Sequence, residues 1–285
     1  MFQFIEDKSS SRKFTSFACD YFGDMHLFEN SWSVSDESFS CQSDLLYTFE
    51  NQFRISALSL NPSNHHQLTL GDTEGNLKLV QISESKRQKS GRNSVQLSTL
   101  IGSDNVTTFK SINQLIWRGD SRILGLGNDN SISVIEPSTL QATFRINTGH
   151  STPLVGEVAG DDPSLTLVGF EDGYIRFFDL RSSQKKAERL FKSHVNSVSC
   201  LRGNQDDSNL FVSGALDGIA KVWDMRSDRP LYSVKIAENS KIFDVNWTGK
   251  REFLTGGDDS SITQHVMNTQ YCLIKSIKTN NHFQR

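Results

Sequence analysis

The sequence predicts an all-β fold in which a four-stranded unit is repeated about six times. Two observations support this prediction. Segments with an acidic residue, a turn-forming residue and then an alternating strand recur along the chain, and no run of ten or more residues keeps a clear helical period. Repeats of about 40–45 residues with four strands each are typical of β-propeller blades. One such sheet cannot bury both faces, so we expect the sheets to stack around an axis.

Five segments carry the repeat clearly. They are Leu70–Gln81, Gly127–Glu136, Val168–Asp179, Ser213–Asp224 and Thr255–Val266. Their acidic residues, at separations of 55, 43, 45 and 42 residues, are Glu74, Asp129, Asp172, Asp217 and Asp259. A weaker copy, Ser33–Gln42, centres on Asp36 and leaves Met1–Arg12 outside the repeats. We therefore predict a single propeller domain over residues 1–285 with about six blades. Seven blades, or an open ring that accepts a strand or blade from a partner, are the alternatives.

The strands of one repeat can be placed from the sequence. Its four short runs, rich in β-branched and apolar residues, are Val195–Leu201, Asn209–Ala215, Ile219–Met225 and Pro230–Ile236. Asp217-Gly218 separates the second run from the third, and Asp-Gly between two such runs is a strong signal for a tight hairpin. The run Tyr271–Thr279 has the alternation expected of a last outermost strand.

The interval after Glu74 is longer than the others because of a polar, basic insert. We place this loop at about residues 85–94, and its basic residues are Lys86, Arg87, Lys89 and Arg92. A run of like charges is usually a solvated loop. The alternatives are a salt-sensitive contact to RNA phosphates, which would not read sequence, or a nuclear-localisation signal.

One repeat carries His194, Ser213, Asp217 and Trp223-Asp224, and with these residues the chain resembles the WD-repeat family. The resemblance implies that His194, Ser213, Asp217 and Trp223 form a hydrogen-bonded structural tetrad inside one blade. These groups can satisfy one another in series. A hydrolase triad is the competing interpretation of the Ser, His and Asp, but the chain has no GxSxG motif.

The same resemblance implies where partners would bind. In that family the turns between second and third strands line one rim of the propeller, and partners usually bind there. On this chain the implied partner-binding residues are Phe170, Glu171, Leu216 and Asp258. The apolar Phe170 and Leu216 are candidate anchors. For Phe170, packing inward between blades is the alternative.

Residues Leu210–Trp247 and Phe253–Ile262 also resemble the ribosome-biogenesis WD-repeat family whose members join pescadillo and the block-of-proliferation protein. The basic insert lies where that family carries a basic loop. The chain departs from the family in two respects. Nothing in Met1–Glu50 resembles its N-terminal ubiquitin-like domain, and we count six repeats where the family has seven or more.

Composition and motifs argue against several classes of protein. The net charge of -3 excludes a chain-wide basic surface for nucleic acid, and no apolar run approaches the roughly 18 residues of a membrane span. The start of the chain does not read as a secretion signal. The four cysteines form no CxxC pair, and there is no Walker loop, HExxH or dinucleotide-binding motif. We therefore expect no catalytic residues, no cofactor and no metal site.

The sequence thus predicts a non-catalytic scaffold that binds other proteins in a stable complex, with biogenesis of the large ribosomal subunit as the first hypothesis. The alternatives are a structural propeller subunit of a coat or nuclear-pore-type assembly, and a substrate-presenting adaptor of an enzyme complex. We expect a nuclear or cytoplasmic protein that is not secreted and does not insert into membranes.

Overall fold

The computed structural model describes most of the chain. The described residues are 2–6, 13–19, 24–34, 39–49, 54–86, 93–102, 109–119, 122–182, 186–236, 240–268 and 272–277. They form β-strands and connecting turns, and none of them lies in a helix. Within these ranges there is accordingly no helix that could cross a membrane.

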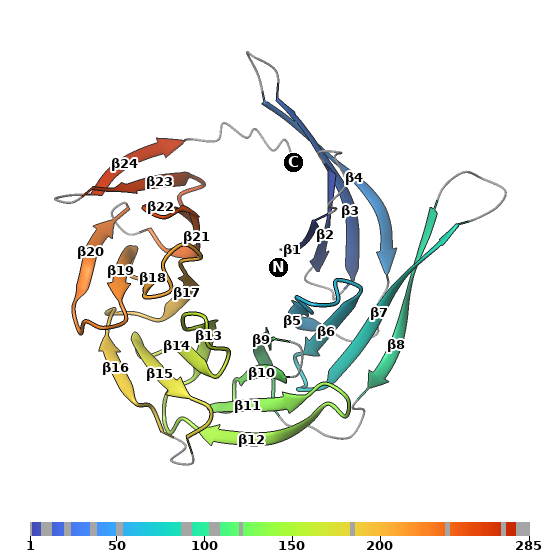
Figure 1. The fold of residues 1–285 in the computed structure, drawn as a ribbon, viewed down its shortest axis with the longest axis horizontal. Coiled ribbons are helices and arrows are strands. Elements are labelled where there is room, and N and C mark those ends of the chain that lie inside the picture. Colours follow the sequence, from blue (N-terminus) through green and yellow to red (C-terminus); the bar gives the residue numbers. More distant parts are fainter. Residues whose placement is uncertain are drawn as a thin grey trace. The chain divides into compact units, whose positions relative to one another are not determined.

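The strands form six four-stranded antiparallel sheets (Figure 1). Blade 1 contains β1 (Phe2–Glu6), β2 (Lys13–Cys19), β3 (Met25–Val34) and β4 (Phe39–Phe49). Blade 2 contains β5 (Ile55–Leu60), β6 (Gln67–Asp72), β7 (Leu77–Lys86) and β8 (Asn93–Gly102). Blade 3 contains β9 (Ile112–Arg118), β10 (Arg122–Gly127), β11 (Ser131–Glu136) and β12 (Gln141–Asn147).

The second half of the chain repeats the pattern. Blade 4 contains β13 (Pro153–Val158), β14 (Leu165–Phe170), β15 (Tyr174–Asp179) and β16 (Arg189–Lys192). Blade 5 contains β17 (Val198–Gly203), β18 (Leu210–Ala215), β19 (Ile219–Asp224) and β20 (Pro230–Lys235). Blade 6 contains β21 (Ile242–Gly249), β22 (Glu252–Gly257), β23 (Ile262–Met267) and β24 (Cys272–Ile277). Consecutive strands pair in order within each sheet, which is the blade architecture of a β-propeller. The predicted all-β fold of six blades is confirmed.

The sequence placed the first blade wrongly. Residues Phe2–Glu6, which the repeat count left over, form β1 and pair with β2. The turn between second and third strands lies between Cys19 and Met25. Asp36, predicted as the acid of that turn, falls between β3 and β4 and lies outside the described residues.

The basic insert is an extension of the last hairpin of blade 2. Strands β7 and β8 pair as far as Ser85 with Ser94 and Lys86 with Asn93. The predicted loop at 85–94 is therefore wrong at both ends, because these four residues are in the strands. Residues 87–92 lie outside the described part of the chain.

The chain divides into two compact units. The first comprises Met1–Gly125 and Ser133–Phe144, and the second comprises Leu126–Ile132 and Arg145–Arg285. Within the first unit, one apolar core joins blades 1 and 2, and another joins blades 2 and 3. Within the second unit, corresponding cores join blades 4 and 5 and blades 5 and 6.

A glycine in the second strand lets neighbouring blades approach closely. A Cβ atom on Gly71 would lie 2.8 Å from Ile112, on Gly169 2.6 Å from Val198, and on Gly214 2.7 Å from Ile242. In each pair the apolar side chain belongs to the innermost strand of the next blade. A glycine in a strand interior often marks such a close approach.

Candidate functional site

The four residues of the predicted tetrad are hydrogen-bonded in series inside blade 5. The Nε1 atom of Trp223 donates to Ser213 Oγ at 2.9 Å, and Ser213 Oγ lies 2.9 Å from His194 Nε2. The Nδ1 atom of His194 lies 3.1 Å from an oxygen of Asp217. Because an ionised carboxylate can only accept, His194 Nδ1 donates to Asp217. In the neutral imidazole, Nε2 is then the acceptor for the proton of Ser213 Oγ.

The electrostatics of Asp217 suit this arrangement. Burial raises the pKa of its carboxyl group, but hydrogen bonds from His194 and from the backbone amides of Val195 and Ile219 outweigh burial, so its pKa lies below the ordinary value. The carboxylate is thus ionised near neutral pH. Ser213 is fully buried and is hydrogen-bonded to both the indole of Trp223 and the imidazole of His194. This environment is typical of a serine that stabilises the fold.

The tetrad also fixes the surface above it. Asp217 Oδ2 accepts the amide of Val195 at 3.1 Å, and the amide of Leu216 donates to Ser197 O at 3.0 Å. Val195 is held in this way with 94% of its surface exposed. Leu216 is partly buried.

Phe170 is not a surface anchor. It is 0% exposed at the end of β14. The guanidinium of Arg176 covers its ring at 4.1 Å from the centroid and is held there by Asp172, with Arg176 Nη2 2.6 Å from Oδ2. The prediction that Phe170 binds partners on the rim is therefore wrong, because Arg176 and the neighbouring Phe178 enclose the ring.

The other two predicted rim residues are exposed. Glu171 lies in the turn after β14, and its carbonyl oxygen accepts from Ser197 Oγ at 3.1 Å. The Asp258 carboxylate accepts the amide of Lys241 at 2.7 Å, so it also stabilises the entry to β21. Glu171 and Leu216 are thus connected through Ser197 at the junction of blades 4 and 5.

Blade 6 adds two exposed apolar residues that the sequence analysis missed. Phe243 is 54% exposed at the start of β21, and Ile262 is 44% exposed at the start of β23. A bulge between Ile242 and Asp244 places Phe243 in the extra position. At the equivalent bulges of blades 2 and 5, Ser56 Oγ donates to the carbonyl oxygen of Gly71 and Ser199 Oγ to that of Ile242, which a phenylalanine cannot do.

We define the apolar rim as Val195, Leu216, Phe243 and Ile262. All four lie at the ends of blades 5 and 6 where the turn between second and third strands is found. The blades are joined there, because Ser199 Oγ donates to the carbonyl oxygen of Ile242 at 2.5 Å. Val195, Phe243 and Ile262 are exposed and Leu216 is partly buried. Such a group of apolar side chains at the surface is typical of a protein-binding surface.

Blade 6 carries a weaker version of the tetrad. In blade 6, His265 occupies the position of Trp223, and its Nε2 atom lies 2.9 Å from Thr255 Oγ1. The His265 ring is fully buried and stacks on Phe253 at 4.6 Å. Its Nδ1 atom has no hydrogen-bond partner, and burial lowers the pKa of the imidazole to about 4.

In blade 2 the acid of the turn is not the one that the sequence predicted. Asp72 Oδ1 accepts the amides of Glu74 and Asn76 at 2.9 and 2.8 Å, whereas the side chain of Glu74 is exposed. Aspartate is the residue that commonly bonds the backbone two residues further on, and Asp72 bonds Glu74 in this way.

Of the candidate nucleic-acid contacts, only Lys86 lies in the described part of the chain, at the end of β7. Arg87, Lys89 and Arg92 lie outside it. Among the described residues, no group of three or more His, Cys, Asp or Glu side chains could hold a metal ion.

Comparison with known proteins identifies the repeat. The family model "WD domain, G-beta repeat" matches residues 185–224, the segment that contains the tetrad. The ribosome biogenesis protein WDR12 homolog of Trichoplax adhaerens is 30% identical over 155 residues, which cover 53% of this chain and 35% of that protein. The ribosome biogenesis protein YTM1 of Scheffersomyces stipitis is 28% identical over 146 residues, which cover 48% and 31%.

A third relative, the WDR12 homolog of Drosophila persimilis, is 26% identical over 172 residues, which cover 60% of this chain and 40% of that protein. Each alignment thus spans well under half of the relative's length. The fold is that of a β-propeller, and the segment that contains the tetrad matches a WD repeat. Within that class it is similar to ribosome biogenesis proteins, as the sequence resemblance predicted.

Proposed function

We propose that this chain is a non-catalytic scaffold that binds other proteins of a complex acting in ribosome biogenesis. The observation that carries the proposal is the apolar rim. Val195 is almost fully exposed, yet its backbone is fixed by the carboxylate of the buried tetrad. Rigid presentation of apolar side chains reduces the entropy that is lost when a partner binds.

The similarity to known proteins supports ribosome biogenesis as the process in which this scaffold acts. The three relatives named above are ribosome biogenesis proteins, and the chain aligns with parts of them. We infer a nuclear location from the same similarity. In this proposal the hairpin of β7 and β8 remains a candidate contact to RNA phosphates, because it carries four basic residues between Ser85 and Arg92.

Affinity purification of the tagged chain, followed by mass spectrometry, tests this proposal. Recovery of pescadillo-type ribosome assembly factors would support it. Recovery of coat or nuclear-pore subunits would instead indicate a structural role in such an assembly. Recovery of a methyltransferase or ubiquitin ligase would indicate an adaptor role.

The absence of catalysis is tested separately. We expect the isolated chain to show no hydrolase or transferase activity and to bind no nucleotide. Isothermal titration calorimetry with ATP and GTP checks the second point, and a tight dissociation constant would contradict the proposal.

A further inference from the structure

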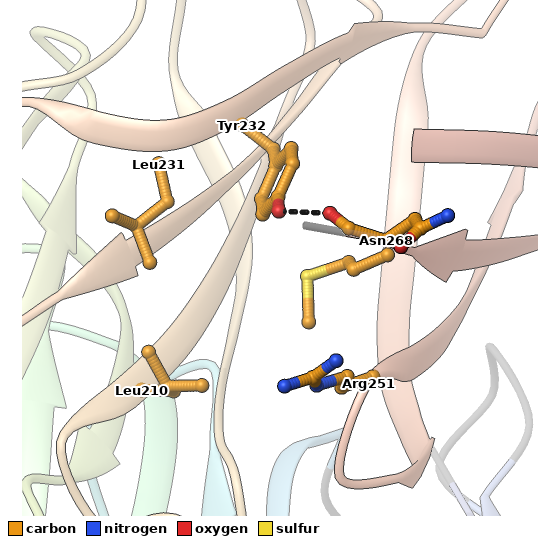
Figure 2. Close-up of a pocket in the computed structure, with 6 residues that line it drawn as sticks. Leu210, Leu231, Tyr232, Arg251 and Asn268 are labelled. Carbon is orange, nitrogen blue, oxygen red and sulfur yellow. Dashed lines mark hydrogen bonds between the residues drawn. The ribbon is translucent and has the colours of Figure 1, made fainter. Parts of the chain in front are cut away.

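A pocket lies at the opposite end of blade 5 from the apolar rim. It is lined by Leu210, Leu231, Tyr232, Arg251, Met267 and Asn268, and has a volume of about 170 Å³ (Figure 2). Leu210 begins β18, whereas Leu216 follows its last residue. Six residues of extended strand separate the two positions by about 20 Å. The pocket is therefore a second site, independent of the apolar rim.

The walls of the pocket are apolar and held in place. Leu210 and Leu231 come from blade 5 and Met267 from blade 6. The hydroxyl of Tyr232 donates to the carbonyl oxygen of Asn268 at 2.5 Å, and the amide of Met267 donates to the carbonyl oxygen of Arg251 at 2.8 Å (Figure 2). The first bond joins the two blades across the pocket, so the cavity is formed before any ligand binds.

The size of the pocket matches one large apolar side chain. An apolar cavity of about 150 Å³ holds a benzene molecule. A phenylalanine or leucine side chain therefore fits in the space available. Leu231 is 50% exposed and Arg251 is also exposed, so the pocket opens to solvent beside these two residues.

The positive charge of Arg251 at the opening favours a ligand that carries a carboxylate next to the apolar side chain. Arg251 contributes a guanidinium to the lining, and among the described residues no carboxylate pairs with it. A guanidinium binds a carboxylate through paired hydrogen bonds, and it is less strongly hydrated than an ammonium group. The pocket thus combines one apolar cavity with one cation at its edge that has no ion-pair partner among the described residues.

We propose that this pocket binds an acidic, extended segment of another protein, with an aromatic or leucine side chain in the cavity and an adjacent carboxylate on Arg251. The occupant is a peptide segment because Leu231 lies on β20, the outermost strand of blade 5, where a chain can run along the surface. This site gives the scaffold a second, chemically distinct point of attachment.

Fluorescence polarisation with labelled peptides tests the proposal on the full chain. The probes are an acidic peptide (SEEFEES), a basic peptide (SKKFKKS) and an acidic peptide without the ring (SEESEES). We expect the acidic peptide with phenylalanine to bind about tenfold more tightly than either of the others, because it alone offers both a ring for the pocket and carboxylates for Arg251. No binding of that peptide, or equal binding of the basic one, would overturn the proposal.

Variants locate the binding. Arg251→Glu should remove the preference for the acidic peptide. Leu231→Ser should lower the affinity for that peptide severalfold. Lys235→Glu makes the same charge change at the other end of β20 and should leave binding unchanged. Leu216→Glu on the apolar rim should also leave it unchanged, so failure of the rim proposal and failure of this one are distinguishable. Equal affinity for free phenylacetate would identify a small-molecule site and contradict the peptide assignment.

Discussion

At the residue scale, one position in the third strand of a blade determines how the core of that blade is stabilised. In blade 5 it is Trp223, which packs against Phe191 and Phe211 and donates to Ser213. In blade 6 it is His265, which keeps the hydrogen bond to a hydroxyl but has an unpaired nitrogen. The resemblance to the WD-repeat family implied the first arrangement. It could not predict the second, because the partner of a buried imidazole depends on side chains from other strands.

Replacing Trp223 tests the tetrad. Trp223→Ala leaves a cavity beside Phe211 and removes the donor to Ser213, and we expect it to lower the free energy of unfolding by about 3–5 kcal/mol. Trp223→Phe keeps most of the packing and should cost less. Chemical denaturation measures both. An unchanged melting temperature for Trp223→Ala would refute the blade assignment.

His265 makes stability depend on pH. Its pKa is lowered by burial to about 4 in the folded chain, so the unfolded chain binds the proton more readily between pH 6.5 and 4. Folding stability is therefore complete above pH 6.5 and falls toward pH 4, at a rate of up to about 1.4 kcal/mol per pH unit. Urea denaturation across this range should show the loss for the natural chain and a smaller one for His265→Phe. The same loss in both would exclude His265 as its cause.

At the element scale, strand placement follows from alternation, but the details of pairing do not. The runs predicted for blade 5 match β17 to β20 within a few residues. The bulge at the start of the innermost strand recurs in blades 2, 4, 5 and 6. A bulge shifts the side-chain alternation by one residue. This shift is why the exposure of Phe243 could not be predicted from period-2 alternation.

The glycine of the second strand provides a matched pair of variants. A Cβ atom on Gly214 would lie 2.7 Å from both Cys200 Sγ and Ile242 Cγ2, which are buried, whereas one on Gly256 would meet nothing within 4 Å. We expect Gly214→Ala to destabilise the chain by about 1–3 kcal/mol through overpacking. Gly256→Ala should change stability by less than about 0.5 kcal/mol. Thermal melts compare them, and equal melting temperatures would contradict this account of blade packing.

At the scale of the whole molecule, the period of the acidic turns predicted blades 2 to 6, and the sixth repeat was counted from the segment around Asp36. The first blade was misplaced because the acidic segment around Asp36 resembles the repeat, whereas the turn between second and third strands lies between Cys19 and Met25. The exposed residues were harder to predict. Val195 stands in a polar loop, and its exposure follows from a hydrogen bond to Asp217 that sequence spacing does not encode. The apolar side chains of a surface are not periodic, so repeats locate strands better than binding sites.

Two charge variants distinguish the apolar rim from the basic hairpin as the main contact. In Leu216→Glu the backbone bond from residue 216 to Ser197 is kept, so the blade should fold normally. A new carboxylate that loses its water against a partner without a counter-charge costs several kcal/mol, so binding should be lost. In Lys86→Glu only screened electrostatics change, and we expect an effect of about 0–1 kcal/mol.

Circular dichroism and thermal melts should show both variants folded, and pull-downs should show loss of partners for Leu216→Glu alone. Val195→Glu should behave like Leu216→Glu, because the two residues are adjacent on the apolar rim. If Lys86→Glu alone releases the partners, the hairpin of β7 and β8 is the contact. A salt titration then separates the two kinds of partner. Binding to RNA phosphates weakens steeply as salt rises, whereas an apolar protein contact does not.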